Sequence, residues 1–244
     1  MITTLLYFFI GHVIADFYAQ SETMARDKKT DQRALTAHII IYAVIIILLG
    51  LLTFNVSYIF LAVVLSAVHA VIDYLKFNLT HKQKLSKQQN IKIFAFDQFL
   101  HIASITGIIL IASAWLAKPD IWQFLSTELN VAFTTMLQWL LVILIIIKPA
   151  SIVIRMTLGY FEPKEVADNN PGIIQAGEFI GILERLTILI LLGAQAYAAI
   201  GFVITAKSIA RYNKIAEEPK FAEYYLIGTL MSALIVLTMY HIIF

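Results

Sequence analysis

Apolar stretches of membrane-spanning length fill most of the chain and leave little room for any other kind of fold. A helix needs about 20 mainly apolar residues to cross the hydrocarbon core of a bilayer. The stretches that approach or exceed this length are 3–19, 35–53, 56–78, 92–116, 132–158, 174–205 and 222–243. Because every backbone polar group in lipid needs an internal partner, we expect an all-α, polytopic transmembrane bundle of about seven spans, plus or minus one.

The composition supports this class and limits the chemistry. Hydrophobic residues make up 60% of the 244 residues, against about 45–50% in ordinary soluble domains. The sequence contains no cysteine, so any metal site must use histidine and carboxylate ligands. The net charge of +2 is small, and the basic residues lie in loops. We therefore expect membrane lipids, and no nucleic acid, as partners.

The distribution of lysine and arginine predicts which loops face the cytoplasm. Basic residues gather after the first and the third apolar stretch, at Arg26, Lys28, Lys29 and Arg33 and at Lys82, Lys84 and Lys87. Short cytoplasmic loops carry an excess of these residues. We expect both loops to be cytoplasmic and the N-terminus to lie outside.

The C-terminal half fits this orientation less well. The basic segment 206–220 would lie outside if 174–205 crossed the membrane once, and 174–205 is too long for one upright span. A re-entrant or interfacial segment in this region could restore the agreement. Pro149 could also break the stretch 132–158, because proline removes a helical hydrogen bond.

Histidine and aspartate recur four residues apart in three of the apolar stretches. The pairs are His12 with Asp16, His69 with Asp73, and Asp97 with His101. Residues at this spacing share one helix face. The order is reversed in the third pair, whose stretch runs in the opposite direction, so all the aspartates lie nearer the cytoplasmic loops. With His38 at a similar depth, we expect side chains from four consecutive helices to converge in one layer.

These groups are too costly in a membrane to be incidental. An aspartate at the centre of a span costs about 2.5–3.5 kcal/mol, and such residues usually mark a site or a pathway. Imidazole and carboxylate together suit zinc, manganese or iron, and helical bundles build such sites on facing helices. We assign the following metal ligands: His12, His69, Asp73, Asp97 and His101.

Asp16 and His38 would complete a second metal position or act as general base. Two other readings of the same residues stay open. One is a metal-free polar network that handles protons. The other is structural hydrogen bonding between helices.

A second polar set lies in the C-terminal half. Glu184 and Arg185 interrupt an apolar helix, and Lys207 and Arg211 are four residues apart on one helix face. The last two could bind a lipid phosphate or pair with Glu184, Glu217 or Glu223. We assign binding of an anionic headgroup to Lys207 and Arg211. We expect one membrane domain, in which residues 1–116 carry the histidines and aspartates and residues 117–244 carry this set.

Several motifs resemble a known family. They are "GHVIADFYAQ", "HAVIDYLKF" and "FDQFLH" in the first half, and "GEFIGILERL", "AKSIARY" and "AEYYLIGTLMS" in the second. As a set they resemble the bacterial membrane family catalogued as domain of unknown function 3307. Its pattern of membrane histidines and aspartates is similar to that of proteins described as membrane-bound metal-dependent hydrolases.

The residues and this resemblance favour an integral-membrane, metal-dependent hydrolase with a site near the cytoplasmic side. Its substrate would be a lipid or a lipid-linked ester, and its cofactor a divalent ion of zinc, manganese or iron. One alternative is a proton or divalent-metal transporter or channel, which needs polar residues across the whole membrane. The outer halves of the first four stretches are nearly all apolar, which argues against it. Another alternative is a membrane anchor subunit for a cytosolic partner.

Overall fold

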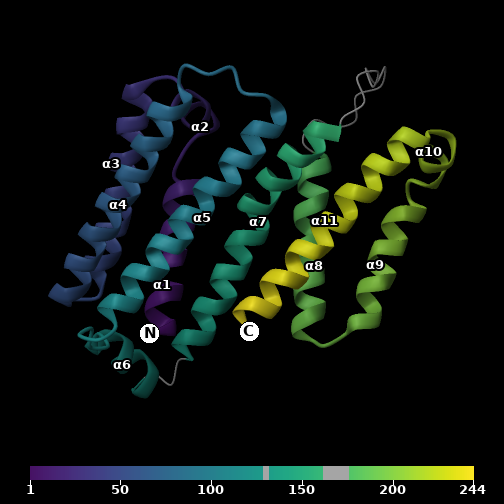
Figure 1. Cartoon of the computed structure of the whole chain (residues 1–244). Helices are drawn as coiled ribbons and strands as arrows, with labels where there is room; N and C mark the ends of the chain where they lie inside the picture. The colour runs from purple at the N-terminus through teal and green to yellow at the C-terminus, as the bar shows by residue number, and fades with distance from the viewer. Residues whose placement is uncertain (129–131, 162–175) are drawn as a thin grey trace. The chain divides into compact units, whose positions relative to one another are not determined.

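The computed structural model describes residues 1–128, 132–161 and 176–244, and the regular elements in these ranges are all helices (Figure 1). The predicted all-α class is confirmed. The chain divides into two units, Met1–Leu141 and Val142–Phe244, each with its own packing. Helix α7 (Phe133–Phe161) contains the boundary between them.

Unit 1 is a bundle of antiparallel helices. Its elements are α1 (Ile2–Val13), the π-helical turn η1 (Ile14–Tyr18), α2 (Glu22–Asp27), α3 (Gln32–Leu52), α4 (Val56–Thr80), α5 (Lys87–Ala112), α6 (Asp120–Thr127) and the start of α7. Asp31, Asn55 and Ser86 cap α3, α4 and α5 by accepting hydrogen bonds from backbone N–H groups. Helices α3, α4 and α5 alternate in direction, so α2 lies at one end of the unit and α6 at the other (Figure 1).

An apolar core fills the α6 end of unit 1. Its buried members include Phe8, Ile46, Tyr58, Ile109 and Trp122. Helices α3 and α4 approach closely here, because a Cβ atom on Gly50 would lie 2.8 Å from the Cβ atom of Ala62. The histidines and aspartates are therefore left to the opposite end of the unit, near α2 and the α4–α5 loop.

Unit 2 contains the rest of α7, α8 (Ala176–Gly193), α9 (Tyr197–Ile209), α10 (Tyr212–Glu217) and α11 (Pro219–Ile243). The predicted stretch 174–205, whose first two residues lie outside the described ranges, is divided between α8 and α9. A turn separates these helices, and Gln195 has a positive φ of 56° there. The chain reverses at this turn (Figure 1). Helix α7 runs through Pro149 without a break, so the suggestion of a break was wrong.

The helices have the lengths of a membrane protein. Helices α3, α4, α5, α7 and α11 are each long and apolar enough to cross a bilayer, while Ile2–Tyr18 and α9 are shorter apolar helices. Apolar side chains such as Ile40, Val44 and Leu48 on α3 are exposed, as expected for a face toward lipid. Helix α8 is of similar length but carries Glu178, Glu184 and Arg185. The span count is compatible with about seven.

Buried Arg185 stabilises the turn of α7 that contains Pro149. Its Nε donates to the carbonyl of Ile146 at 2.5 Å, and its Nη2 donates to Ser151 Oγ at 2.6 Å. Proline lacks an N–H and weakens the helical ladder around it, and backbone carbonyls in a membrane need replacement donors. The guanidinium supplies one of them.

The substitution Arg185→Leu should lower the free energy of unfolding by about 2–3 kcal/mol, because buried acceptors on α7 lose their donor. Thermal unfolding in detergent measures the change. The matched control is Arg155→Leu, since Arg155 pairs with Glu178 at the surface and its side chain is 57% exposed. That change should cost about 1 kcal/mol or less. Equal losses in the two variants would contradict this role of Arg185.

Candidate metal centre

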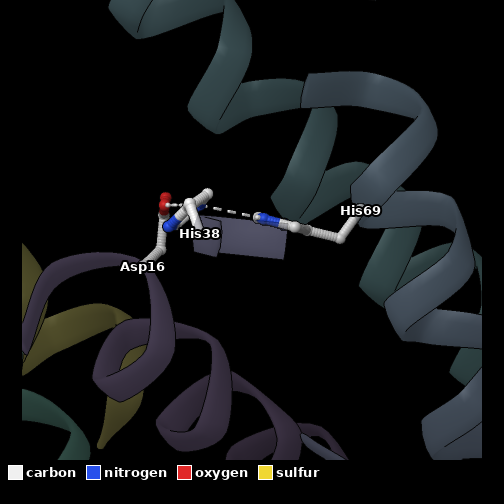
Figure 2. Close-up of side chains that lie close together, drawn as sticks. All are labelled: Asp16, His38 and His69. Carbon is white, nitrogen blue, oxygen red and sulfur yellow. Dashed lines mark hydrogen bonds and ion pairs between the residues drawn. The ribbon is translucent and has the colours of Figure 1, made fainter. Parts of the chain in front are cut away.

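The histidines and aspartates of unit 1 form one buried layer. The predicted residues come from α1, η1, α3, α4 and α5, and each is at most 7% exposed: His12, Asp16, His38, His69, Asp73, Asp97 and His101. Figure 2 shows Asp16, His38 and His69 pointing toward one another, with His38 between the other two. The structure thus brings side chains from separate helices to one place, and their roles as ligands stay a prediction.

Three potential ligand atoms lie around the imidazole of His38. Its Nε2 lies 3.3 Å from Asp16 Oδ1, 3.2 Å from Asp73 Oδ2 and 3.4 Å from His69 Nε2. The last two groups lie 3.5 Å apart, from His69 Nε2 to Asp73 Oδ2. We call Asp16, His38, His69 and Asp73 the donor centre.

Four pairwise distances in the donor centre, His38 to Asp16, His69 and Asp73 and His69 to Asp73, match those between neighbouring tetrahedral metal ligands. Metal–ligand bonds of about 2.0–2.2 Å place neighbouring tetrahedral ligands about 3.3–3.6 Å apart. In addition, Asp73 Oδ2 is buried and makes no hydrogen bond within the described ranges. Buried polar atoms normally have partners. The donor set therefore fits a divalent cation in both chemistry and spacing.

A second group overlaps the first. Donor atoms of His69, Asp73 and His101 all lie within 4.8 Å of one another, as do those of Asp16, His38 and His69. Asp97 lies beside the second group, with Oδ1 3.6 Å from His101 Nε2. Because His69 belongs to both groups, the two positions are not independent.

His12 lies at the deep edge of the layer. Its Nδ1 is 3.2 Å from the hydroxyl oxygen of Tyr42, and its ring centroid is 5.3 Å from that of His101. Neither three-residue group includes His12 or Asp97. Their predicted place among the ligands thus has weaker geometric support than that of His69, Asp73 and His101.

A π-helical turn sets the direction of Asp16. The N–H of Ala19 donates to the carbonyl of Ile14, five residues earlier, at 2.9 Å. Such wide turns are rare and often occur at functional sites. His12 and Asp16 consequently do not keep the relation expected of a regular α-helix, and they contact different partners: His12 contacts Tyr42, and Asp16 contacts His38.

Two lysines enter the layer, Lys28 and Lys76, and the sequence analysis identified neither as part of it. The ammonium of Lys28 lies 3.0 Å from His38 Nε2 and 3.4 Å from Asp16 Oδ1. That of Lys76 donates to Asp73 Oδ1 at 2.6 Å and to Asp97 Oδ2 at 2.9 Å. The i,i+3 spacing of Asp73 and Lys76 was a usable signal, whereas Lys28 is twelve residues from Asp16 and had none.

The lysines at this end of unit 1 lie beside the buried carboxylates. Lys29 follows Lys28 directly and belongs to the same basic loop. Partial burial, together with the ammonium groups of Lys76 and Lys28, lowers the pKa of the Lys29 amine. The positive charges of Lys28 and Lys76 therefore offset the negative charge of the buried aspartates.

Two further contacts orient the donors. Gln98, which follows Asp97 directly in the sequence, donates from Nε2 to Asp16 Oδ2 at 2.9 Å. The ring of Tyr42 stacks on His69 at a centroid distance of 3.4 Å. Tyr42 is four residues after His38, so its place on the same helix face was readable from the sequence. Hydrogen bonds and stacking of this kind hold metal ligands in place.

Comparison with known proteins places the chain in a family. A family model described as protein of unknown function (DUF3307) matches residues 4–133, more than half of the chain. The chain belongs to the DUF3307 family. The DUF3307 match covers all the histidines and aspartates of the layer and ends near the start of α7. No curated protein and no solved structure matches the chain.

The residues predicted to bind an anionic headgroup lie in unit 2. Lys207, near the end of α9, donates a hydrogen bond to Glu184 on α8, which was one of the partners considered for it. Arg211 is exposed at the junction of α9 and α10. Both residues line the same cavity.

Proposed function

We propose that the donor centre binds one divalent metal ion and that the protein is a membrane-embedded, metal-dependent hydrolase. The observation that carries the proposal is the position of His38 Nε2, which lies 3.2–3.4 Å from an oxygen of Asp16, an oxygen of Asp73 and Nε2 of His69. Asp16, His38, His69 and Asp73 would hold the ion. A metal bound there would supply Lewis acidity and lower the pKa of a water molecule toward about 7.

The proposal gives the neighbouring residues separate tasks. His101 lies between two carboxylates, with Nε2 3.7 Å from Asp73 Oδ1 and 3.6 Å from Asp97 Oδ1, and is placed to hold and release a proton. Gln98 orients Asp16 through its hydrogen bond. Lys28 and Lys76, at the mouth of the layer, would bind the negative charge of a substrate.

The apolar core of unit 1 supports a one-sided site over a transport path. A transporter needs polar groups on both sides of its binding site. Here the α6 end is filled by buried side chains such as Phe8, Ile46 and Ile109. The buried hydroxyls of Thr4 and Tyr58 at that end bond to each other at 2.9 Å. The site would therefore open toward the basic loops alone.

The reversal between α8 and α9 supports the proposed orientation, with the N-terminus outside a bacterial plasma membrane. These helices form a hairpin, so segment 206–220 returns to the side on which α8 begins, whether the hairpin crosses the membrane or only enters it. If the chain alternates sides at α1, α3, α4, α5 and α7, that side is cytoplasmic. All three basic loop regions then satisfy the positive-inside rule.

Hydrolysis of a lipid-linked ester tests the activity. The protein would be reconstituted in vesicles with phospholipid and other lipid phosphate esters, treated with a chelator, and assayed after zinc, manganese or iron is restored. We expect product only with restored metal, and a loss of at least about a hundredfold in His69→Ala, which removes a residue of the donor centre. Unchanged turnover in that variant would rule out a reaction at the donor centre.

A further inference from the structure

Unit 2 contains a cavity of about 730 Å³ that the metal chemistry does not use. It lies between the C-terminal part of α7, the start of α8, the end of α9 and helix α11. Its volume is within the range of about 300–1,000 Å³ typical of sites for one small ligand. The DUF3307 match ends at residue 133, so the cavity lies outside the matched region.

A stripe of hydroxyl groups on α11 faces this cavity. Tyr225, Thr229 and Ser232 all line it and lie on one helix face, at spacings of four and three residues. Thr229 and Ser232 are each 3% exposed. The three hydroxyl oxygens are buried and lack a hydrogen-bond partner in the part of the chain that the structure describes. Buried hydroxyls normally have partners, so this stripe is suited to hydrogen-bond a ligand.

The charges that line the cavity favour an anion. Its lining includes Arg155, Arg185, Lys207 and Arg211, with Glu178 as the lining carboxylate. Three of the cations already have partners: Arg155 pairs with Glu178, Lys207 bonds to Glu184, and Arg185 bonds to Ile146 and Ser151. Arg211, which is exposed, forms no ion pair with the described residues. The guanidinium of Arg211 is therefore available to pair with a phosphate group.

The remaining walls of the cavity are apolar. They include Ile154 and Leu158 on α7, Ile180 on α8 and Phe221 on α11. A Cβ atom added to Gly177 would have no neighbouring atom of the described residues within 4 Å, so there is space beside α8 at this position. A ligand that fills this cavity therefore needs an apolar part as well as a charged one.

We propose that unit 2 binds a single-chain lipid phosphate. Arg211 and Lys207 take the phosphate, the hydroxyl stripe hydrogen-bonds the polar linker, and the apolar chain lies along α7 and α11. The proposal goes beyond the metal-dependent activity and does not depend on it, because every residue it uses belongs to unit 2. It also assigns Lys207 and Arg211 a ligand of definite chemistry.

Binding of three probes to the full-length, metal-free protein in detergent tests this site. Oleoyl lysophosphatidic acid carries both chain and phosphate, monoolein carries only the chain, and glycerol 3-phosphate carries only the phosphate. We expect the first probe to bind at least about tenfold more tightly than either of the others, since it alone makes the charged and the apolar contacts. Working with a chelator present keeps this result separate from the metal site.

Matched variants locate the binding. Arg211→Gln, and Thr229→Val combined with Ser232→Ala, should each weaken lysophosphatidic acid binding by about tenfold, while Arg211→Lys should keep most of it. Lys220→Gln is the control, because Lys220 carries the same charge on α11 without lining the cavity. Unfolding temperatures would show that each variant is folded. Equal affinity for monoolein, equal affinity for glycerol 3-phosphate, or equal loss in Lys220→Gln would overturn the proposal.

Discussion

Purified protein, freed of any affinity tag, should hold close to one equivalent of a divalent metal, and His38→Ala should hold almost none. The imidazole of His38 is fully buried, and its Nε2 lies within 3.4 Å of the other three donors. Removing it leaves the two carboxylates and His69 without the ligand that joins them. Asp73→Ala should have the same effect. Elemental mass spectrometry after a wash with a mild chelator measures the content.

His81→Ala is the matched control for this experiment. His81 follows α4 directly, and its Nδ1 lies 2.9 Å from the carbonyl oxygen of Phe77, away from the donor centre. This variant should keep the wild-type metal content. A well-folded wild-type protein without metal would contradict the metal assignment and favour a proton-handling network of the same residues. Metal lost equally from His81→Ala would contradict the assignment to the donor centre.

The membrane architecture of unit 1 was predictable because it depends on local features. Helix α3 needs only a long apolar run and a capping Asp31, both of which are visible in the sequence. The reversed order of Asp97 and His101 was informative for the same reason. Helices α4 and α5 are antiparallel, so reversing the order places the aspartates of both helices at one depth and the histidines at another. The family match over residues 4–133 agrees with the resemblance drawn from the first-half motifs.

The finer structure of the site depends on features that a sequence pattern does not carry. The π-helical turn at Ile14–Tyr18 changes the direction of the Asp16 side chain. The spacing of His12 and Asp16 in the sequence does not predict this turn. Lys28 follows the short helix α2, which has no buried residues, and its side chain still reaches Asp16. This contact depends on the tertiary fold and has no local sequence signal. The split of 174–205 into α8 and α9 was only partly readable, as excess length and as Gly193 at the end of α8, because the residue with positive φ in the turn is Gln195 and not glycine.

Lys28→Met should make metal binding about 10- to 100-fold tighter. The ammonium of Lys28 lies 3.0 Å from His38 Nε2, 3.4 Å from Asp16 Oδ1 and 4.0 Å from Asp73 Oδ2, so it occupies the side of the donor centre that a cation would use. A metal ion must displace it. A charge-assisted hydrogen bond contributes about 1.5–3 kcal/mol, and each 1.4 kcal/mol is a factor of about ten in affinity.

The same variant separates metal binding from a purely structural network, because the two make opposite predictions for stability with metal. Without metal, Lys28→Met should unfold at a lower temperature than wild type, since the buried carboxylates lose a counter-charge. With zinc or manganese, it should gain more stability than wild type, because a ligand of the folded state stabilises in proportion to the logarithm of its affinity. Lys29→Met, which removes the same charge from the next residue of the basic loop, should show neither effect. If Lys28→Met is destabilised and no divalent metal restores its stability, the metal assignment is contradicted. Lys28 would then be a permanent part of the layer, and its ammonium group would be the cation that the buried aspartates bind.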